Sequence, residues 1–246
     1  MVGDARRSGP LSEGVGRFAP VLIERRCAAC GCPGEVLCAA CIATLRPAPA
    51  TEPPPGVDTF DALLRYEGTA RALVLGLKYR NARRALGILA RALADGCARH
   101  GAVAVTFTPT TAARRRERGY DQAELLARAV ARRLAVPSVA LLARAAGPPQ
   151  TGRARAERLA GPLLVARRAH PGPILVVDDV CTTGATLAAA ATALRSVGAG
   201  PIHAAALAVT PAAPRSGSLK PATVTAEDGM GGLVDPHEKR NFDATD

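Results

Sequence analysis

The stretch that decides the fold is Ile174-Leu-Val-Val-Asp-Asp-Val-Cys-Thr-Thr-Gly-Ala-Thr-Leu187. Its first four residues are apolar and mostly β-branched, which is typical of a buried central strand in a parallel sheet. Two aspartates follow at the carboxyl end of this predicted strand. Residues 182–186 are small and predict a tight turn, and the alanine-rich residues 187–194 predict a helix. The order is therefore strand, turn and helix, as in an α/β fold.

This order has a chemical meaning at the turn. In an open α/β sheet, ligands bind beyond the carboxyl ends of the strands, and the N-terminus of a helix favours phosphate. Gly184 lets the backbone approach a ligand closely, and the hydroxyls of Thr182, Thr183 and Thr186 add hydrogen-bond donors. The turn is therefore predicted to hold a phosphate group.

Asp178 and Asp179 stand directly before the predicted phosphate turn. Two adjacent carboxylates are poorly placed to bind phosphate because like charges repel, but they suit a diol such as the two hydroxyls of a ribose. The run therefore predicts a site for a ribose 5-phosphate group. The alternative is that the two aspartates merely end a strand and that the threonines and the glycine cap a helix.

The length and composition allow one sizeable α/β domain with a small appendage, because the chain has 246 residues of which 48% are hydrophobic. Near the N-terminus the longest apolar stretch is residues 18–23, which is too short for a secretory signal. No window approaches the ~18 apolar residues of a membrane span. With seven cysteines and no export signal, the expected location is the reducing cytoplasm.

The charge favours polyanionic partners, either nucleic acid or a phosphate-rich small molecule. The net charge is +11, and residues 211–246 carry four basic and six acidic groups, which leaves +13 for the first 210 residues. Of the 32 basic residues 29 are arginine, so a general compositional bias is an alternative explanation. Aromatic residues make up 3% of the chain, too few to predict a base-stacking platform.

Two Cys-x-x-Cys pairs, Cys27 with Cys30 and Cys38 with Cys41, lie seven residues apart. This spacing is typical of a tetrahedral four-cysteine zinc site in which each tight turn supplies two thiolates. Such a short module cannot bury a core, so the metal would supply its folding energy. A redox dithiol pair is the alternative, and the spare thiol of Cys32 could replace Cys30 as a ligand.

The two remaining cysteines lie outside this module. Cys97 falls in a predicted helix and is expected to be a core residue. Cys181 lies inside the predicted phosphate turn, where it is either a reactive thiol near a helix N-terminus or a small apolar filler.

Hydrophobic periodicity predicts further strands and helices that alternate along the chain. Such alternation favours a mostly parallel sheet flanked by helices, with right-handed crossovers. The proline-rich residues 46–56 predict a linker, and residues 211–246 predict a disordered tail. The strands are expected at residues 60–66, 102–107, 139–142, 163–165 and 202–209, and the helices at residues 69–77, 83–98 and from about 122 to 134.

Arg114, Arg115, Arg116 and Arg118 place four guanidinium groups within five residues, in a predicted loop after a strand that ends in Thr108-Pro109-Thr110. Such a cluster at a strand end indicates an anion site. The alternative is an arginine-rich face that is merely solvated.

Two other segments fit the same site. Residues 144–161 are rich in Gly, Pro and Arg without a clean period, which suits a mobile loop that closes over a ligand. Lys78-Tyr79-Arg80 sets two cations around an aromatic ring and could hold a phosphate or a base. A solvated helix end is an equally good interpretation of these three residues.

The run from Ile174 to Leu187 closely resembles the phosphoribosyl pyrophosphate (PRPP) signature of type I phosphoribosyltransferases. The order of motifs over residues 27–209 resembles the ComF family, which is associated with competence and DNA uptake. The motifs that carry this resemblance are the cysteine pairs, Lys78-Tyr79-Arg80, Arg116-x-Arg118-Gly119-Tyr120-Asp121-Gln122, Gln150-Thr151-Gly152 with Glu157-Arg158, and the PRPP signature.

The resemblance implies a type I phosphoribosyltransferase-like α/β fold with an N-terminal zinc module, and the predicted disordered tail lies outside it. The chain then divides into a partly disordered N-terminal segment 1–26 with a short helix within residues 11–26, a zinc module 27–46, a linker 47–56, the main domain 57–210 and the tail 211–246.

The resemblance also implies roles for named residues. Asp178 and Asp179 would hold the ribose hydroxyls, directly or through Mg²⁺, and residues 144–161 would form the flexible hood. The four cysteines of the paired motifs would bind Zn²⁺. The remaining PRPP-binding residues would be Pro109, Thr110, Arg114, Arg115, Arg116 and Arg118 at the pyrophosphate, and Cys181, Thr182, Thr183, Gly184, Ala185 and Thr186 at the 5-phosphate.

This sequence departs from the family pattern at two places. Thr108-Pro109-Thr110 stands where a Pro-Val-Pro is usual, which affects the geometry expected of the pyrophosphate loop. Asp121 stands where Asn is usual. If this residue contacts nucleic acid, the added charge should weaken binding, but if it caps the helix from Gln122, Asp serves as well as Asn.

Three functional hypotheses follow. The first is a phosphoribosyltransferase, a glycosyltransferase that moves ribose 5-phosphate from PRPP to an acceptor. The second is a single-stranded DNA-binding module in which the PRPP site is a sensor or vestigial. The third is a docking module for a DNA-uptake helicase or a membrane uptake partner. The partners expected are PRPP or a related phosphoribosyl compound, single-stranded DNA, the helicase, and a second copy of the chain in a homodimer.

Overall fold

The computed structural model describes residues 25–79, 83–145 and 162–211. It divides the chain into two units, Met1–Pro211 and Ala212–Asp246, and all described residues belong to the first. Several predictions therefore lie outside the described residues. These are the N-terminal helix, Arg80, residues 146–161 of the hood and residues 212–246 of the tail.

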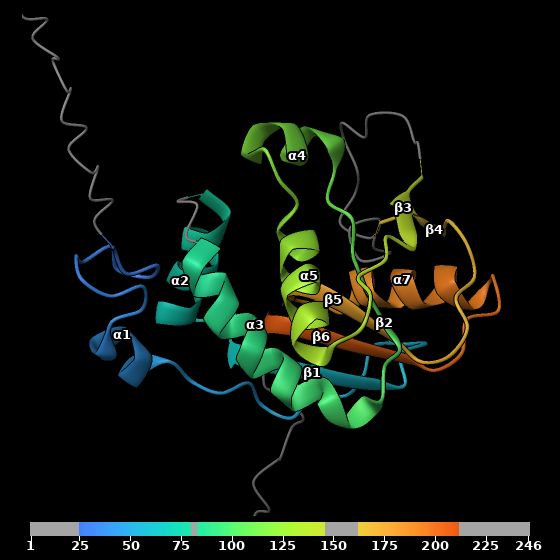
Figure 1. Cartoon of the computed structure of the whole chain (residues 1–246), viewed down its shortest axis with the longest axis horizontal. Coiled ribbons are helices and arrows are strands. Elements are labelled where there is room, and N and C mark those ends of the chain that lie inside the picture. The colour runs from blue at the N-terminus through green and yellow to red at the C-terminus, as the bar shows by residue number, and fades with distance from the viewer. Residues whose placement is uncertain (1–24, 80–82, 146–161, 212–246) are drawn as a thin grey trace, which may run out of the picture. The chain divides into compact units, whose positions relative to one another are not determined.

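The centre of the first unit is a parallel sheet of four strands in the order β1-β6-β5-β2 (Figure 1). The two inner strands carry the most buried residues, and all eight residues of β6 are buried. The inner strands begin as or consist mainly of apolar residues that can be buried on both faces, whereas the edge strand β1 is mixed and mostly half-buried. The strands are β1 (Thr59–Arg65), β2 (Ala104–Phe107), β5 (Ile174–Cys181) and β6 (Ile202–Val209).

Helices cover both faces of this sheet, as Figure 1 shows. Alternate residues of β5 point to opposite faces. Leu175 and Val177 pack with residues of α2, α3 and α5, whereas Ile174 and Val176 pack with α7. The predicted α/β class with a mostly parallel sheet flanked by helices is therefore confirmed. These helices are α2 (Gly68–Tyr79), α3 (Arg83–Cys97), α5 (Gln122–Leu134) and α7 (Ala185–Arg195).

Smaller elements complete the unit. The strands β3 (Leu142–Arg144) and β4 (Leu164–Ala166) pair in an antiparallel ribbon. The helix α4 (Ala112–Arg118) buries none of its residues and stands away from the sheet in Figure 1. The helix α1 (Ala39–Thr44) belongs to the cysteine module, and a 3₁₀ turn, η1 (Ala98–His100), follows α3. Within the described ranges, no helix is long and apolar enough to cross a membrane.

The predicted linker, residues 46–56, packs against the domain. The N–H of Arg65 donates to the carbonyl of Arg46 at 2.9 Å, so the linker pairs with the end of β1. Further along the linker Pro54 is buried. The linker therefore lies on the sheet domain and does not hang free as a spacer.

Three elements differ from the predictions. The strand expected at residues 139–142 forms instead at Leu142–Arg144, where β4 pairs with it. β5 extends through the two aspartates to Cys181, because β6 continues beside it and Cys181 pairs with Val209. The arginine run forms helix α4 and not a loop. Thr111 caps this helix by accepting from the N–H of Arg114 at 3.3 Å. Gly119 ends it in the left-handed region with φ of 75°.

Candidate functional site

A polar cavity of about 290 Å³ lies at the carboxyl edge of the sheet. Both acidic and basic side chains line it, which is typical of a site for a charged ligand. Its lining residues come from the last half of β5 and the turn into α7, from the segments that follow β1 and β2, from the end of α2, and from α4, α5 and β3. They are Tyr66, Lys78, Thr108, Pro109, Thr110, Arg114, Arg118, Asp121, Gln122, Ala123, Arg144, Asp178, Asp179, Val180, Thr182 and Thr186.

Asp178 and Asp179 lie side by side in the last half of β5 and line this cavity. Asp178 is 9% exposed, and its Oδ1 accepts from the N–H of Asp179 at 2.8 Å. Burial raises the pKa of Asp178 to about 8, and the charge of Asp179 adds to this rise. The Oδ2 atom of Asp179 lies 2.6 Å from the ammonium of Lys78.

The predicted phosphate turn forms a small hollow at the N-terminus of α7. Gly184 is the N-cap residue with φ of 76°, and a Cβ there would lie 2.9 Å from Cγ of Pro54 in the linker. Only glycine therefore suits this position. The hydroxyl of Thr183 accepts from the N–H of Ala185 at 3.4 Å. The turn thus lies directly at the N-terminus of α7, the place where a helix favours a phosphate.

Cys181 is buried at the end of β5, and burial raises the pKa of its thiol to about 11. A raised pKa keeps this thiol protonated, which favours the small apolar filler over the reactive thiol, and Cys181 also lines the hollow of the phosphate turn. Burial likewise raises the pKa of Cys97 to about 12, and this last residue of α3 lies in the hydrophobic core, as expected.

Two of the four arginines of the run line the cavity, and the other two lie outside it. Arg114 and Arg118 line the cavity. Arg115 turns away, with its Nη2 atom 3.5 Å from Oε2 of Glu124. Arg116 is exposed and lines neither hollow. The helical form of this segment explains the division, because successive residues of a helix point in different directions.

Residues 121–228 match the family model of the phosphoribosyl transferase domain. The match takes in both aspartates of β5, the phosphate turn and α7, and it supports the type I phosphoribosyltransferase-like fold. Lys78 and the cysteine module lie before it. The matched segment is less than half of the chain, and no curated protein is significantly similar to the chain.

Solved structures with similarity to this chain include phosphoribosyl enzymes. Glutamine PRPP amidotransferase from B. subtilis is 24% identical with a TM-score of 0.38 over 51% of this chain. The match spans only 26% of that enzyme. Purine phosphoribosyltransferase from Pyrococcus horikoshii is 18% identical with a TM-score of 0.37, and the match covers 52% of this chain and 78% of that one.

Some cavity residues were not assigned from the sequence. Asp121 is buried, and its Oδ1 caps α5 by accepting from the N–H groups of Ala123 and Glu124. Its Oδ2 accepts from the N–H of Thr110 at 2.8 Å. Of the two roles considered for Asp121, the structure shows the cap. The same carboxylate also fixes the loop after β2, although burial raises its pKa.

Arg144 and Gln122 were also not assigned from the sequence as ligand-binding residues. The Nε of Arg144 donates to the carbonyl of Pro109 at 2.8 Å, which joins the ribbon β3-β4 to the loop after β2. Gln122 is 5% exposed, and among the described residues its buried Oε1 has no hydrogen-bond partner. The contact of Arg144 joins distant parts of the chain, so no local sequence signal could have revealed it, and residue 144 was predicted only as the first residue of the hood. For Gln122 the motif Arg118-Gly119-Tyr120-Asp121-Gln122 was the indication in the sequence.

Four sulfur atoms converge in the cysteine module, those of Cys27, Cys30, Cys32 and Cys38, and all of them lie within 4.8 Å of one another. Three of these cysteines are predicted ligands, and the fourth is Cys32, the thiol considered as a replacement. Cys41, the remaining predicted ligand, is buried in the same module but lies outside this group. Which four of the five would bind a metal stays a prediction.

The geometry of this cluster fits a zinc ion. Cys30 Sγ and Cys38 Sγ lie 3.8 Å apart, close to the separation of about 3.8 Å that tetrahedral Zn–S bonds of ~2.3 Å give. Burial raises the pKa of Cys27, but backbone N–H groups of Cys38, Cys30 and Ala29 outweigh it and lower the pKa to about 6. A thiolate is the form that binds a metal.

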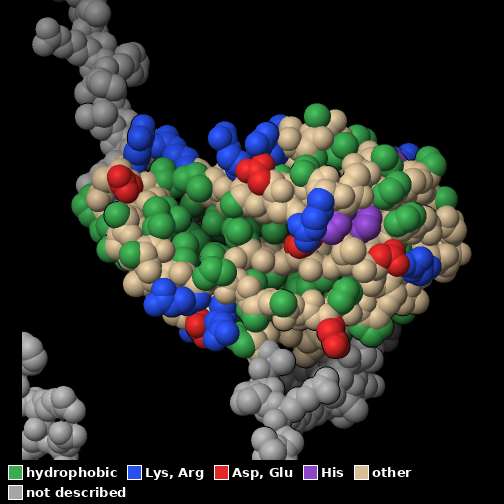
Figure 2. Space-filling model, turned by 90° about the horizontal axis from the view of Figure 1, so that it is seen from below, with side chains coloured by type: hydrophobic (Ala, Val, Ile, Leu, Met, Phe, Trp, Pro, Cys, Tyr) green, Lys and Arg blue, Asp and Glu red, His purple; other side chains and the backbone are tan. Residues whose placement is uncertain are grey.

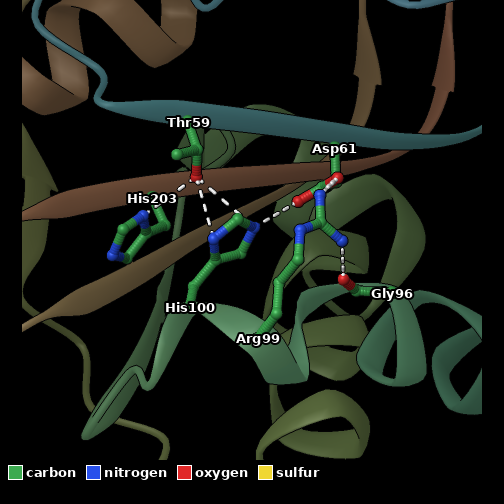
Figure 3. Close-up of polar contacts among 6 residues, drawn as sticks. All are labelled: Thr59, Asp61, Gly96, Arg99, His100 and His203. Atoms are coloured by element: carbon green, nitrogen blue, oxygen red, sulfur yellow. Dashed lines mark hydrogen bonds and ion pairs between the residues drawn. The ribbon is translucent and has the colours of Figure 1, made fainter.

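A second polar cluster lies at the amino end of the sheet (Figure 3). The rings of His100 and His203 stack with centroids 4.6 Å apart. Thr59 Oγ1 lies 2.9 Å from Nδ1 of His203, and Asp61 binds both His100 and Arg99. On the face shown in Figure 2, histidine side chains reach the surface between basic and acidic ones.

This cluster predicts a pH dependence of folding. Burial, and then the neighbouring His100 ring, lower the pKa of His203, although Asp58 and Asp61 oppose the shift. The unfolded chain then binds protons more readily than the folded one, so stability falls as the pH drops below about 6.5. The expected loss is at most about 1.4 kcal/mol per pH unit for this one proton.

Urea unfolding between pH 5 and pH 7.5 measures this effect. His203→Gln should flatten the dependence of the unfolding free energy on pH in this range. The matched control is His170→Gln, because His170 is partly exposed outside this cluster. Equal slopes for the wild type and His203→Gln would contradict the prediction.

Proposed function

We propose that this chain binds PRPP in the cavity at the carboxyl edge of the sheet, as a ComF-type phosphoribosyltransferase-like protein linked to DNA uptake. The observation that carries this proposal is the adjacent pair Asp178 and Asp179, which leads directly into a helix N-terminal turn. A phosphate at the turn and a sugar diol at the carboxylates would be joined as they are in ribose 5-phosphate.

The cavity offers a separate place for the pyrophosphate group. Arg114, Arg118 and Arg144 line it together with Lys78, so its basic side chains outnumber its three acidic ones. Guanidinium groups bind phosphate oxygens in a bidentate manner, which favours a polyphosphate over a neutral ligand. Arg115 and Arg116 are left out of this subsite because they do not line the cavity.

Asp178 and Asp179 also fit Mg²⁺, because Mg²⁺ in such sites binds one or two carboxylates together with substrate phosphates. When bound, the ion would neutralise charge on the leaving pyrophosphate. The protein's own part in transfer would be to orient the sugar and to stabilise its positive charge by electrostatics. In this reaction the bond from C1 of the ribose to pyrophosphate breaks, and a bond from C1 to the acceptor forms.

Calorimetric titration with PRPP and Mg²⁺, compared with ribose 5-phosphate and Mg²⁺, tests this function. We expect saturable binding of both compounds, with PRPP at least about tenfold tighter because it adds charge-assisted hydrogen bonds. The matched control is ribose, which lacks the phosphate. Absence of PRPP binding would refute the proposal and leave a vestigial site.

A second candidate function is binding of single-stranded DNA, with the PRPP site as a sensor. It is favoured by Arg115 and Arg116, which are exposed on α4 outside the cavity. Replacing both by alanine should weaken DNA binding and reduce the salt slope by about 0.7 for each lost phosphate contact. The control is Arg91→Ala, an exposed arginine on α3. An unchanged slope would exclude α4 from the DNA site.

We further propose that the cysteine module binds one structural Zn²⁺ and serves as a docking surface for a DNA-uptake helicase. All seven cysteines are free thiols, which is consistent with a reducing cytoplasm.

A homodimer is part of the same proposal, and sedimentation of the zinc-loaded protein would test it.

A further inference from the structure

Lys78 forms a close ion pair with one of the two carboxylates of the cavity. Its Nζ atom lies 2.6 Å from Oδ2 of Asp179, and each side chain is 17% exposed. Solvent screens such a partly buried pair less than a surface pair. Asp179, which is proposed to hold the ribose hydroxyls or Mg²⁺, is therefore already paired with a cationic side chain of the protein.

The position of Lys78 is fixed by a contact from a distant part of the chain. Lys78 lies in the last turn of α2. The hydroxyl of Tyr120 hydrogen-bonds to the carbonyls of Leu77 and Lys78 at 2.7 and 3.1 Å. Tyr120 directly precedes Asp121, which caps α5 and holds the loop after β2. The residues that hold the end of α2, and with it Lys78, are therefore next to those that hold the loop and helix lining the cavity.

An ammonium group differs from a guanidinium in a way that matters here. It is a compact charge on a flexible stem with three donors, so it can move from one anion to another by rotation about its side-chain bonds. The same cavity is the proposed place of the pyrophosphate. Lys78 therefore has two anions within one cavity, Asp179 before PRPP binds and a phosphate afterwards.

We propose that the ammonium of Lys78 takes the place of a metal ion at Asp179 and keeps free divalent ions from this carboxylate. The metal then binds only together with PRPP. The pyrophosphate draws the ammonium away from the carboxylate, and Asp179 becomes available at that moment. This inference rests on the proposed function, because it assumes that PRPP occupies the cavity. It adds an order to binding, in which the metal–PRPP complex is the species that the site accepts.

Binding of Mn²⁺ alone, followed by electron paramagnetic resonance, tests this directly. The wild type should bind Mn²⁺ weakly in the absence of PRPP. Lys78→Gln should bind it about tenfold to a hundredfold more tightly, the range expected when one charged hydrogen-bond partner is removed. Lys78→Arg is the matched control, because it keeps the positive charge and should bind Mn²⁺ as weakly as the wild type.

A double variant locates the effect on the carboxylate. Lys78→Gln combined with Asp179→Asn should lose the gain in Mn²⁺ affinity. Lys78→Met provides a second neutral replacement, and thermal unfolding by circular dichroism verifies that each variant is folded. Equal Mn²⁺ affinity in the wild type and in both folded neutral variants would overturn the proposal.

PRPP titrations separate this inference from the function on which it rests. With Mg²⁺ present, Lys78→Gln should bind PRPP more weakly than the wild type, because the ammonium no longer contacts the pyrophosphate. If the Mn²⁺ affinities change as expected while the wild type does not bind PRPP, the proposed function fails and the metal-excluding ion pair stands. If PRPP binds and the Mn²⁺ affinities do not differ, only the ion-pair proposal fails.

Discussion

Replacing Asp178 and Asp179 together by asparagine is expected to abolish PRPP binding by this protein. Each carboxylate would lose charged hydrogen bonds of about 1.5–3 kcal/mol to the ribose hydroxyls or their metal. The two losses together reduce affinity by at least about a hundredfold. Calorimetric titration of the double variant with PRPP and Mg²⁺ measures this change.

The same double variant should remain folded. Burial raises the pKa of Asp178 to about 8, so this carboxyl is mainly neutral at pH 7, and a neutral amide of the same shape can replace it. The matched control is Glu35→Gln with Asp95→Asn, since both of these acidic side chains are exposed outside the cavity. Unchanged PRPP affinity in the Asp178 and Asp179 variant would refute the ribose assignment.

Chelation is expected to release about one zinc ion per chain, because a four-thiolate site holds one ion. Loss of the ion should unfold the cysteine module, since apparent binding energies of structural zinc are on the order of 10 kcal/mol. Few residues could replace this energy, and Leu37 is the only large aliphatic side chain buried among described residues 25–45. Hydrogen exchange should rise in this module while β5 and β6 stay protected.

A matched variant separates the cluster from other thiols. Cys97→Ala should release the same amount of zinc as the wild type, because Cys97 lies in the core of the main domain. Cys27→Ser combined with Cys38→Ser, which leaves three of the five cysteines of the module, should lose the ion. A fully protected module in metal-free protein would show that thiol packing alone folds it.

The central strands were predictable because their sequence pattern is local and strong. Residues 202–209 were expected to form a strand and form β6 with the same limits. An uninterrupted apolar run buried on both faces leaves little room for another interpretation. β5 was predicted too short, since its polar aspartates resemble a strand end although the ladder with β6 continues past them.

The candidate site was predictable only where its residues are neighbours in sequence. The two aspartates and the phosphate turn lie in one run, and their arrangement follows from the change of strand to helix. The ion pair of Lys78 with Asp179 and the bond from Arg144 to the loop after β2 join separate segments. Such contacts depend on the packing of whole elements, which a single sequence does not specify. The arginine run illustrates this, because its helix directs two arginines to the cavity and two away.

The contact between Pro54 and Gly184 has a consequence for dividing this protein into parts. The predicted boundary after residue 56 separates the linker from the main domain in sequence. In space the linker supports the phosphate turn, because Pro54 fills the position that a side chain on residue 184 would occupy. A fragment that begins at residue 57 would lack Pro54 and would leave Gly184 without this packing partner. The smallest autonomous ligand-binding fragment should therefore include the linker, although the linker contributes no residue to the cavity.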